Sequence, residues 1–181
     1  DTALVGAYLH DGVAVDGGAA YVFVRTGMTW TQQAKLVSAD MAASDQFGVS
    51  VALDGDTAVI GAFGDDDKAS NAGTAFVFVR SGMTWTQEAK LTAGDGAAND
   101  NFGRAVAIAG NTVVVGAPND DDTAANSGSA YVFTRNGTVW TQEAKLVATD
   151  PLASASFGFA VAVHANTALV GHAGFSGTCA V

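Results

Sequence analysis

Several residue types are scarce in this chain, and each scarcity argues against a class of protein. Only 14% of the 181 residues are charged and just two are Glu, whereas the surfaces of helical bundles are rich in Glu, Lys and Arg. The one cysteine, Cys179, cannot form an internal disulfide and says little about the compartment. No apolar stretch reaches the roughly 18 residues of a membrane-spanning helix, and no targeting signal is visible at the start.

Motifs of the common enzyme classes are missing as well. The sequence contains no Gly-x-Ser-x-Gly, no His-Glu-x-x-His and no phosphate-binding loop. A catalytic centre would be expected to interrupt the repetition described below with unusual polar residues in one copy, and no copy has them. We therefore predict no catalytic residues and a protein that is not an enzyme.

The residues that are abundant point to β-structure. Hydrophobic residues make up 49% and glycine occurs 22 times, which argues against disorder, and Val, Thr and aromatic side chains suit pleated, half-buried surfaces. The net charge is −10, and 16 of the 18 acidic residues are Asp, which prefers turns to helices. Such acidity disfavours nucleic acid and anionic lipid as partners.

An internal repeat of 55 residues is the strongest signal in the sequence. Its recurring positions, which we predict to be structural, are Trp30, Trp85 and Trp140, the pairs Phe47-Gly48, Phe102-Gly103 and Phe157-Gly158, and the later glycines Gly61, Gly116 and Gly171. The Phe would plug the core where units meet, and the Gly would allow backbones to approach closely. The Trp would pack between or beside units, with a sugar-stacking surface as the alternative. The three histidines fall at unrelated places in the repeat, which disfavours a histidine metal site.

Each unit is predicted to form four short strands, which in the second copy span 47–53, 56–62, 73–80 and 83–91. Asp54-Gly55 predicts a type I′ hairpin turn. The third strand is apolar on both faces, whereas the fourth alternates apolar and polar residues, with Glu88 and Lys90 suited to protecting an exposed edge. The predicted fold class is therefore all-β, a β-propeller built from four-stranded antiparallel blades.

We predict one domain, 1–181, with blades at about 1–46 (partial), 47–101, 102–156 and 157–181 (partial). Because fewer than four blades cannot close around an axis, this is an incomplete propeller segment. Three alternatives stay open: a fragment of a longer propeller, a ring completed by self-association, or a short open array with exposed apolar faces.

The Phe-Gly pairs followed by Gly61-Ala62-Phe63 and Gly116-Ala117-Pro118 resemble the FG-GAP repeat of integrin α-subunit propellers. The resemblance covers nearly the whole chain. It implies a propeller that lies outside the cell or at the cell surface and recognises a protein or glycan ligand. Many repeats of this family carry a calcium loop, Asp-x-Asp-x-Asp-Gly, between strands one and two, and Asp54-Gly55-Asp56 is too short to be one.

Aspartates cluster in the loops of the predicted blades. The loop between strands two and three emerges at the same end as the loop between blades, so we predict a ligand-binding face there, formed by Asp65, Asp66, Asp67, Asp95, Asp100, Asp120, Asp121 and Asp122. The candidate metal ligands, for Ca²⁺, are Asp65, Asp67, Asp120 and Asp122. The alternatives are ordinary turn chemistry of Asp and recognition of a basic partner.

These observations together predict a non-enzymatic, extracellular scaffold that serves protein binding or cell adhesion through its acidic loops. Two alternatives stay open, an accessory propeller attached to a secreted enzyme and a calcium-dependent recognition module.

Overall fold

The computed structural model of the chain describes residues 1–174, and this part consists of strands and loops without helices. The described part accordingly has no helix that is long and apolar enough to cross a membrane. Cys179 lies outside the described residues.

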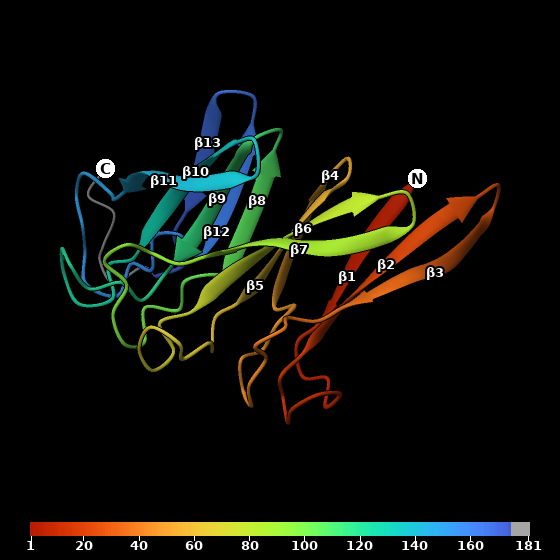
Figure 1. The fold of residues 1–181 in the computed structure, drawn as a ribbon. Coiled ribbons are helices and arrows are strands. Elements are labelled where there is room, and N and C mark those ends of the chain that lie inside the picture. Colours follow the sequence, from red (N-terminus) through yellow and green to blue (C-terminus); the bar gives the residue numbers. More distant parts are fainter. Residues whose placement is uncertain (175–181) are drawn as a thin grey trace.

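Within residues 1–174, thirteen strands form four separate antiparallel sheets (Figure 1). The first sheet contains β1 (Thr2–Ala7), β2 (Ala19–Thr26) and β3 (Thr29–Leu36). The second contains β4 (Ser50–Asp54), β5 (Thr57–Ala62), β6 (Thr74–Ser81) and β7 (Thr84–Leu91). The third contains β8 (Ala105–Ala109), β9 (Thr112–Ala117), β10 (Ser129–Asn136) and β11 (Val139–Leu146). The fourth contains β12 (Ala160–His164) and β13 (Thr167–Gly171).

The predicted fold class, all-β and an incomplete propeller of antiparallel blades, is confirmed. Two complete four-stranded blades stand between a three-stranded and a two-stranded sheet, and no sheet within residues 1–174 closes on itself. The sheets form a fan in which β4 contacts β8 and β8 contacts β12, while β3, β7 and β11 are the edge strands that diverge (Figure 1).

Apolar side chains fill the spaces between neighbouring sheets. Phe47 is fully buried between the first and second sheets, with ring centroids 5.4 Å from Phe76 and 6.0 Å from Phe78. Tilted and edge-on rings at such distances attract one another beyond their burial of surface. Val22 of β2 covers this cluster from the first sheet, and the arrangement recurs around Phe102 at the next junction.

The glycines of the repeat touch across each junction. A Cβ atom at Gly61 would overlap the carbonyl oxygen of Gly103, which lies just before the first strand of the next sheet. Gly103 itself has a φ of +88°, in the left-handed region that favours glycine. The same backbone contact joins Gly6 to Gly48 and Gly116 to Gly158. Each junction therefore has no room for a side chain at these positions.

The first strand of the second blade begins at Ser50, not at residue 47 as predicted. Phe47 N donates to Gly17 O at 2.9 Å, and Phe47 forms an isolated parallel bridge with Gly18, so it belongs to the connection between two sheets. Gly48, with a φ of +94°, then turns the chain into the strand. The predicted start of the strand was wrong because Phe47 is apolar and fits the alternation of apolar and polar residues in the strand that follows. The sequence pattern does not show that a glycine turn separates Phe47 from that strand.

The turn after this strand also differs from the prediction. Asp54 pairs with Thr57, so the two loop residues are Gly55 and Asp56. Only Gly55 has a positive φ, of 56°. Type I′ turns need positive φ at both loop residues, whereas positive φ at the first alone matches type II′.

A hydrogen bond from a tryptophan spans each complete junction. In the fourth strand, a β-bulge leaves Glu88 without a partner in the register between β6 and β7. Trp140 Nε1 donates to Glu88 Oε1 at 2.9 Å, and Trp85 Nε1 donates to Gln33 Oε1, the same position one repeat earlier, at 3.0 Å. Glu88 therefore links two blades instead of protecting an exposed edge.

Gly61→Ala tests the contact between glycine backbones. The added methyl group would overlap a carbonyl that cannot move without shifting the next sheet, so we expect a loss of about 3 kcal/mol or failure to fold. Gly171→Ala is the matched control, because this position in the last sheet meets only Ala160, at 3.6 Å, and stability should change by less than about 1 kcal/mol. Urea unfolding measures both, and equal losses would contradict the role of the close approach.

Candidate functional site: two lysine clamps among the acidic loops

Two kinds of loop meet at one end of the blades, toward the lower side of Figure 1. The loops between strands two and three span 8–18, 63–73 and 118–128, and the loops that join sheets span 37–49, 92–104 and 147–159. Together they contain 13 of the 16 aspartates. We call this side of the molecule the loop end.

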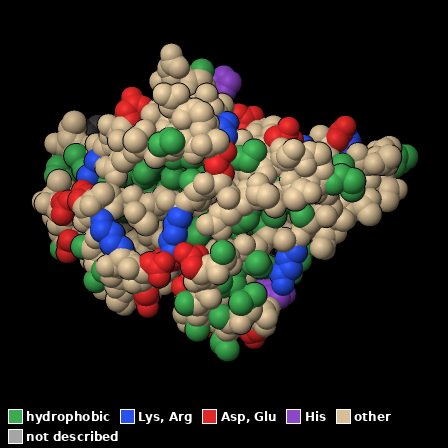
Figure 2. Space-filling view, viewed as in Figure 1, with side chains coloured by type: hydrophobic (Ala, Val, Ile, Leu, Met, Phe, Trp, Pro, Cys, Tyr) green, Lys and Arg blue, Asp and Glu red, His purple; other side chains and the backbone are tan. Residues whose placement is uncertain are grey.

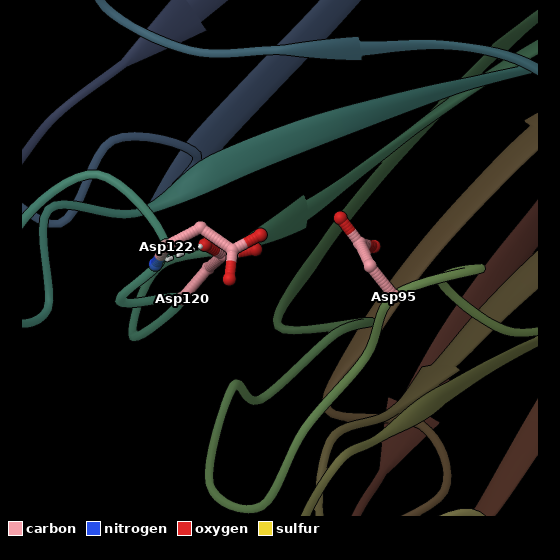
Figure 3. Close-up of side chains that lie close together, drawn as sticks. All are labelled: Asp95, Asp120 and Asp122. Atoms are coloured by element: carbon pink, nitrogen blue, oxygen red, sulfur yellow. Dashed lines mark hydrogen bonds between the residues drawn. The ribbon is translucent and has the colours of Figure 1, made fainter.

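Three aspartates at the loop end surround the ammonium group of Lys145, which extends from β11. Lys145 Nζ donates to Asp95 Oδ2 at 2.8 Å and to Asp122 Oδ2 at 2.6 Å, and it lies 2.7 Å from Asp120 Oδ2. Figure 3 shows Asp120 and Asp122, from one loop, facing Asp95, from a neighbouring loop. One lysine thereby ties two loops to the end of a fourth strand.

The same cluster occurs one repeat earlier around Lys90. Lys90 Nζ donates to Asp40 Oδ2 at 2.7 Å and to Asp67 Oδ2, and it lies 3.0 Å from Asp65 Oδ2. We call the two clusters the lysine clamps. The side chains of Lys90 and Lys145 are only 21% and 19% exposed, so water screens these attractions less than it screens ion pairs on an open surface.

The first aspartate of each triplet is the buried anchor of its clamp. Asp120 is 3% exposed, and its Oδ2 accepts hydrogen bonds from Ser129 Oγ at 2.9 Å and Tyr131 Oη at 2.7 Å. Its Oδ1 accepts from Asp122 N at 3.1 Å, and Asp65 makes the same bond with the nitrogen of Asp67. This local bond from an Asp to the residue two positions later is the usual Asx-turn. It directs the first and third carboxylates toward the lysine.

The remaining predicted face residues lie outside the clamps. Asp66 and Asp121, the middle residues of the triplets, are exposed, and Asp66 Oδ1 accepts from Asn71 N at 2.6 Å. Asp100 is 4% exposed and its Oδ2 accepts from Ala97 N at 2.7 Å. Asp100 therefore stabilises its own loop, whereas the two middle residues are exposed and make no ion pair with the clamp lysines.

The clamps change the pKa values of their members. Burial alone would lower the pKa of Lys145, but hydrogen bonds to Asp120, Asp122 and Asp95 outweigh it and raise that pKa well above its usual value. The pKa of Lys90 is raised in the same way. Burial would raise the pKa of Asp120, but the bonds from Lys145 and Tyr131 outweigh it, so the pKa of Asp120 is lowered. The clamps thus favour the charged forms of Lys90 and Lys145, and the second clamp also favours the charged form of Asp120.

The pKa of Asp100 is shifted in the opposite direction from that of Asp120. Its pKa is raised, because burial and the neighbouring acids Asp120, Asp121 and Asp122 outweigh the hydrogen bond from Ala97 N. The equivalent residue one repeat earlier, Asp45, also has a raised pKa, through burial and the nearby Asp65.

The first repeat has no clamp. Lys35 holds the position of Lys90 and Lys145 but is exposed, and its Nζ lies 3.4 Å from Nε2 of His10. His10 and Gly12 stand where the other repeats have the first and third aspartates. Lys35 is therefore a natural comparison for the two clamped lysines.

The predicted calcium ligands fall into two separate clamps. Carboxylate oxygens of Asp95, Asp120 and Asp122 lie within 4.8 Å of one another, a spacing that suits a cation, but the ammonium of Lys145 lies among them. Ca²⁺ takes six to eight oxygen ligands, and three carboxylates reach the lower number only if each binds through both of its oxygens; otherwise water has to complete the shell. The three carboxylates therefore fit the ammonium group of Lys145. Calcium binding stays a prediction, and the ion would have to displace this lysine.

The lysines are the functional residues that sequence reasoning missed. Lys90 was predicted to protect a strand edge, yet its ammonium lies between two loops. A signal was present, because lysine recurs as Ala-Lys-Leu at 35, 90 and 145, at the same 55-residue spacing as the aspartates.

The repeat unit can now be compared with known proteins. A family model described as "FG-GAP repeat" matches residues 30–78, 85–133 and 140–177. The chain belongs to the FG-GAP repeat family. Each of the first two matched segments begins at the tryptophan of one sheet and ends in the third strand of the next, so the FG-GAP unit includes the junction between blades. Among curated proteins, no match to this FG-GAP chain is found.

Lys145→Met tests the role of the clamp. It leaves three close carboxylates without their cation, so we expect a loss of about 2 kcal/mol, less than for a fully buried pair because Asp122 is exposed. Millimolar Ca²⁺ should then restore part of the stability, because an ion that binds only the folded state stabilises it.

Lys35→Met is the control for this change, since Lys35 has no acidic triplet beside it. It should cost less than about 0.5 kcal/mol and should gain no dependence on calcium. Thermal unfolding with Ca²⁺ and with a chelator distinguishes the two variants, and equal behaviour would contradict the clamp.

The pKa shifts predict how stability depends on pH. The raised pKa values of Lys90 and Lys145 contribute stability that is fully present below 10.5, the ordinary lysine value, and is lost as the pH rises toward the folded-state values. The lowered pKa values of Asp40, Asp95 and Asp120 contribute stability that is present above 3.8 and is lost as the pH falls. Urea unfolding between about pH 5 and pH 11 should show a decline at the alkaline end that becomes shallower in the double variant Lys90→Met, Lys145→Met. An unchanged alkaline decline would contradict the assignment.

Proposed function

We propose that this FG-GAP chain is a non-enzymatic scaffold, located outside the cell or at the cell surface, that binds a basic protein partner through its loop end. The observation that carries the proposal is the gathering of 13 of 16 aspartates in the loops of one end. In Figure 2, acidic side chains lie beside Lys and Arg side chains toward the lower part of this face. The lysine of each clamp offsets only one of its three carboxylates, so the end keeps a strong negative charge.

The rigidity of the loops supports a role in recognition. The clamps and Asx-turns hold both triplets in defined positions, and Lys68 Nζ donates to Gly94 O at 2.7 Å, which joins loop 63–73 to loop 92–104. Asp66 and Asp121 therefore present their carboxylates from ordered loops. A partner meeting such a surface loses less free energy to ordering than one meeting flexible loops.

A protein partner is favoured over a glycan. A neutral sugar needs an open aromatic face for stacking, and Trp85 and Trp140 are held in blade junctions by hydrogen bonds from their indole nitrogens. Carboxylates instead attract Lys and Arg side chains and speed the encounter with a basic surface. Cell adhesion is one function that such a scaffold can serve.

The double variant Asp66→Asn, Asp121→Asn tests the proposal, because it removes two exposed charges and leaves both clamps intact. The probe is a short peptide of alternating Lys and Gly, with the Glu-Gly peptide as the negative partner. We expect the variant to bind the basic peptide roughly five- to tenfold more weakly in physiological salt, since exposed charge pairs contribute about 0.5 kcal/mol each or somewhat more.

The control is Asp1→Asn, Asp56→Asn, which removes the same charge from the opposite end, where both carboxylates are exposed and pair with arginines. Its affinity for the peptide should stay within about twofold of the unmodified chain. The strand β5 between this end and the loops has 6 residues and is therefore roughly 20 Å long, whereas the Debye length in physiological salt is about 8 Å. Equal weakening by both double variants would mean that only net charge matters, and absence of binding would remove the basic partner from the proposal.

A further inference from the structure

The hairpin between β10 and β11 differs in sequence from its two counterparts. Its tip reads Asn136-Gly137-Thr138, where the first two repeats have Thr26-Gly27-Met28 and Ser81-Gly82-Met83. The third tip thus has the form Asn-x-Ser/Thr, with a residue other than proline in the middle, which is the motif that accepts N-linked oligosaccharides. The whole sequence contains eight asparagines, and only Asn136 meets this pattern.

All three residues of the motif are open to solvent. Asn136, Gly137 and Thr138 are exposed, and a Cβ atom built on Gly137 would meet nothing within 4 Å. Asn136 is the last residue of β10 and pairs with Val139, so the loop between the two strands is tight and projects beyond the sheet. An enzyme that attaches an oligosaccharide can therefore reach the asparagine and both of the residues that follow it.

The exposure of this tip does not depend on which sheets flank it. The equivalent hairpin of the second sheet lies between the first and third sheets, and both of these have their third and fourth strands. Ser81, Gly82 and Met83 are nevertheless exposed, Met83 to 78%. Because the outer strands β3, β7 and β11 diverge (Figure 1), a complete sheet on either side leaves the tip of a hairpin in solvent.

The residue opposite Asn136 is also unusual. Residues that pair directly across antiparallel strands have side chains on the same face, with Cβ atoms about 5 Å apart. Asn136 pairs with Val139, which is 62% exposed, whereas the corresponding Ser81 pairs with Thr84. A sugar attached to Asn136 would cover the methyl groups of Val139, so an apolar side chain at this position suits a glycosylated asparagine better than a bare one.

We propose that Asn136 is an acceptor site for an N-linked oligosaccharide. The proposal rests on the location outside the cell that the proposed function includes, because this motif is used in secreted proteins. In the reaction, the side-chain nitrogen of Asn136 attacks C1 of an oligosaccharide carried on a lipid diphosphate. A bond forms between this nitrogen and C1, the bond from C1 to the diphosphate oxygen breaks, the nitrogen loses one proton, and the lipid diphosphate leaves.

The oligosaccharide would stand at the end of the blade opposite the aspartates. β10 begins at Ser129, whose hydroxyl donates to Asp120, and ends at Asn136. It has 8 residues and is therefore roughly 25 Å long. A bulky, solubilising group at its far end leaves the loop end free for a protein partner.

Production of the full chain through the secretory pathway of cultured animal cells tests the site. Trypsin cleaves after Arg135, so the acceptor is the first residue of the peptide 136–145. We expect mass spectrometry to find this peptide with the added mass of an oligosaccharide. Enzymatic removal of the sugar in heavy-oxygen water should leave a heavy-oxygen label at position 136, which distinguishes a former glycan from an asparagine that has deamidated spontaneously.

Variants of the hairpin test the motif itself. Asn136→Gln removes the acceptor and Thr138→Ala removes the hydroxyl, so each should abolish the modification. Thr138→Ser is the matched control and should stay modified, because serine also satisfies the motif. The double variant Ser81→Asn, Met83→Thr places the motif in the second hairpin, where Gly82 has a φ of +62° against +65° for Gly137, and it should add a second oligosaccharide.

Failure of the acceptor site can be distinguished from failure of the proposed function. The Lys-Gly peptide should bind the glycosylated and the unglycosylated chain with affinities within about twofold of each other, because the sugar stands far from the acidic loops. A glycosylated chain that does not bind this peptide would contradict the basic partner and support the acceptor site.

Two results would overturn the acceptor site whether or not the basic peptide binds. The first is a peptide 136–145 that carries no sugar in the chain from the secretory pathway, including the case in which the second hairpin of the double variant is modified. The second is an oligosaccharide that persists in Asn136→Gln, because the sugar would then be attached elsewhere.

Discussion

The close approach of glycine backbones at the blade junctions is the constraint on which the rest of this structure depends. Where Gly61 meets the carbonyl of Gly103, two sheets come into contact at one end without any side chain between them. The fully buried Phe102 can then fill the space between the sheets. The tryptophan of the next fourth strand reaches the bulge residue of the preceding one. A larger residue at either glycine would separate the sheets and leave both the aromatic cluster and this hydrogen bond incomplete.

The stacked sheets bring the acidic loops together, and a lysine side chain reduces the repulsion between their carboxylates. Carboxylates from two neighbouring loops, such as Asp95 in the connection between two sheets and Asp122 within the third sheet, would repel one another at the loop end. The ammonium of Lys145 lies between them on a side chain of β11 in the third sheet. A metal ion could balance the same charges, but it would have to be captured from solution, whereas the lysine is always present and charged at neutral pH. The loops are thereby ordered without a bound ligand, which leaves the middle aspartates available for a partner.

Much of the fold could be predicted from the sequence because the repeat is regular. Recurrence of Trp, Phe-Gly and Gly at 55 residues, with alternating apolar residues between them, predicts four antiparallel strands per unit. The errors have local causes. Phe47 continues the alternation of a strand although it lies in a connection, and the turn at Gly55 starts one residue later than Asp-Gly suggests. The site was predicted only in part, since Asp65 and Asp120 were placed at the correct end while Lys90 was assigned to a strand edge and Lys145 was given no role.

The sequence by itself determined the repeat, the strands, the membership of the FG-GAP family and the gathering of aspartates in loops, because these follow from local preferences and from spacing along the chain. Only the tertiary structure decided which charges meet. Lys145 and Asp95 are 50 residues apart, and Lys145 and Asp122 are 23 apart, so their contact exists only after the sheet has paired and both loops have folded toward its end. The same holds for Trp140 and Glu88, which are 52 residues apart in different blades. Contacts of this kind depend on register, on the bulge in the fourth strand and on the distance between sheets, none of which has a pattern in the sequence of a single strand.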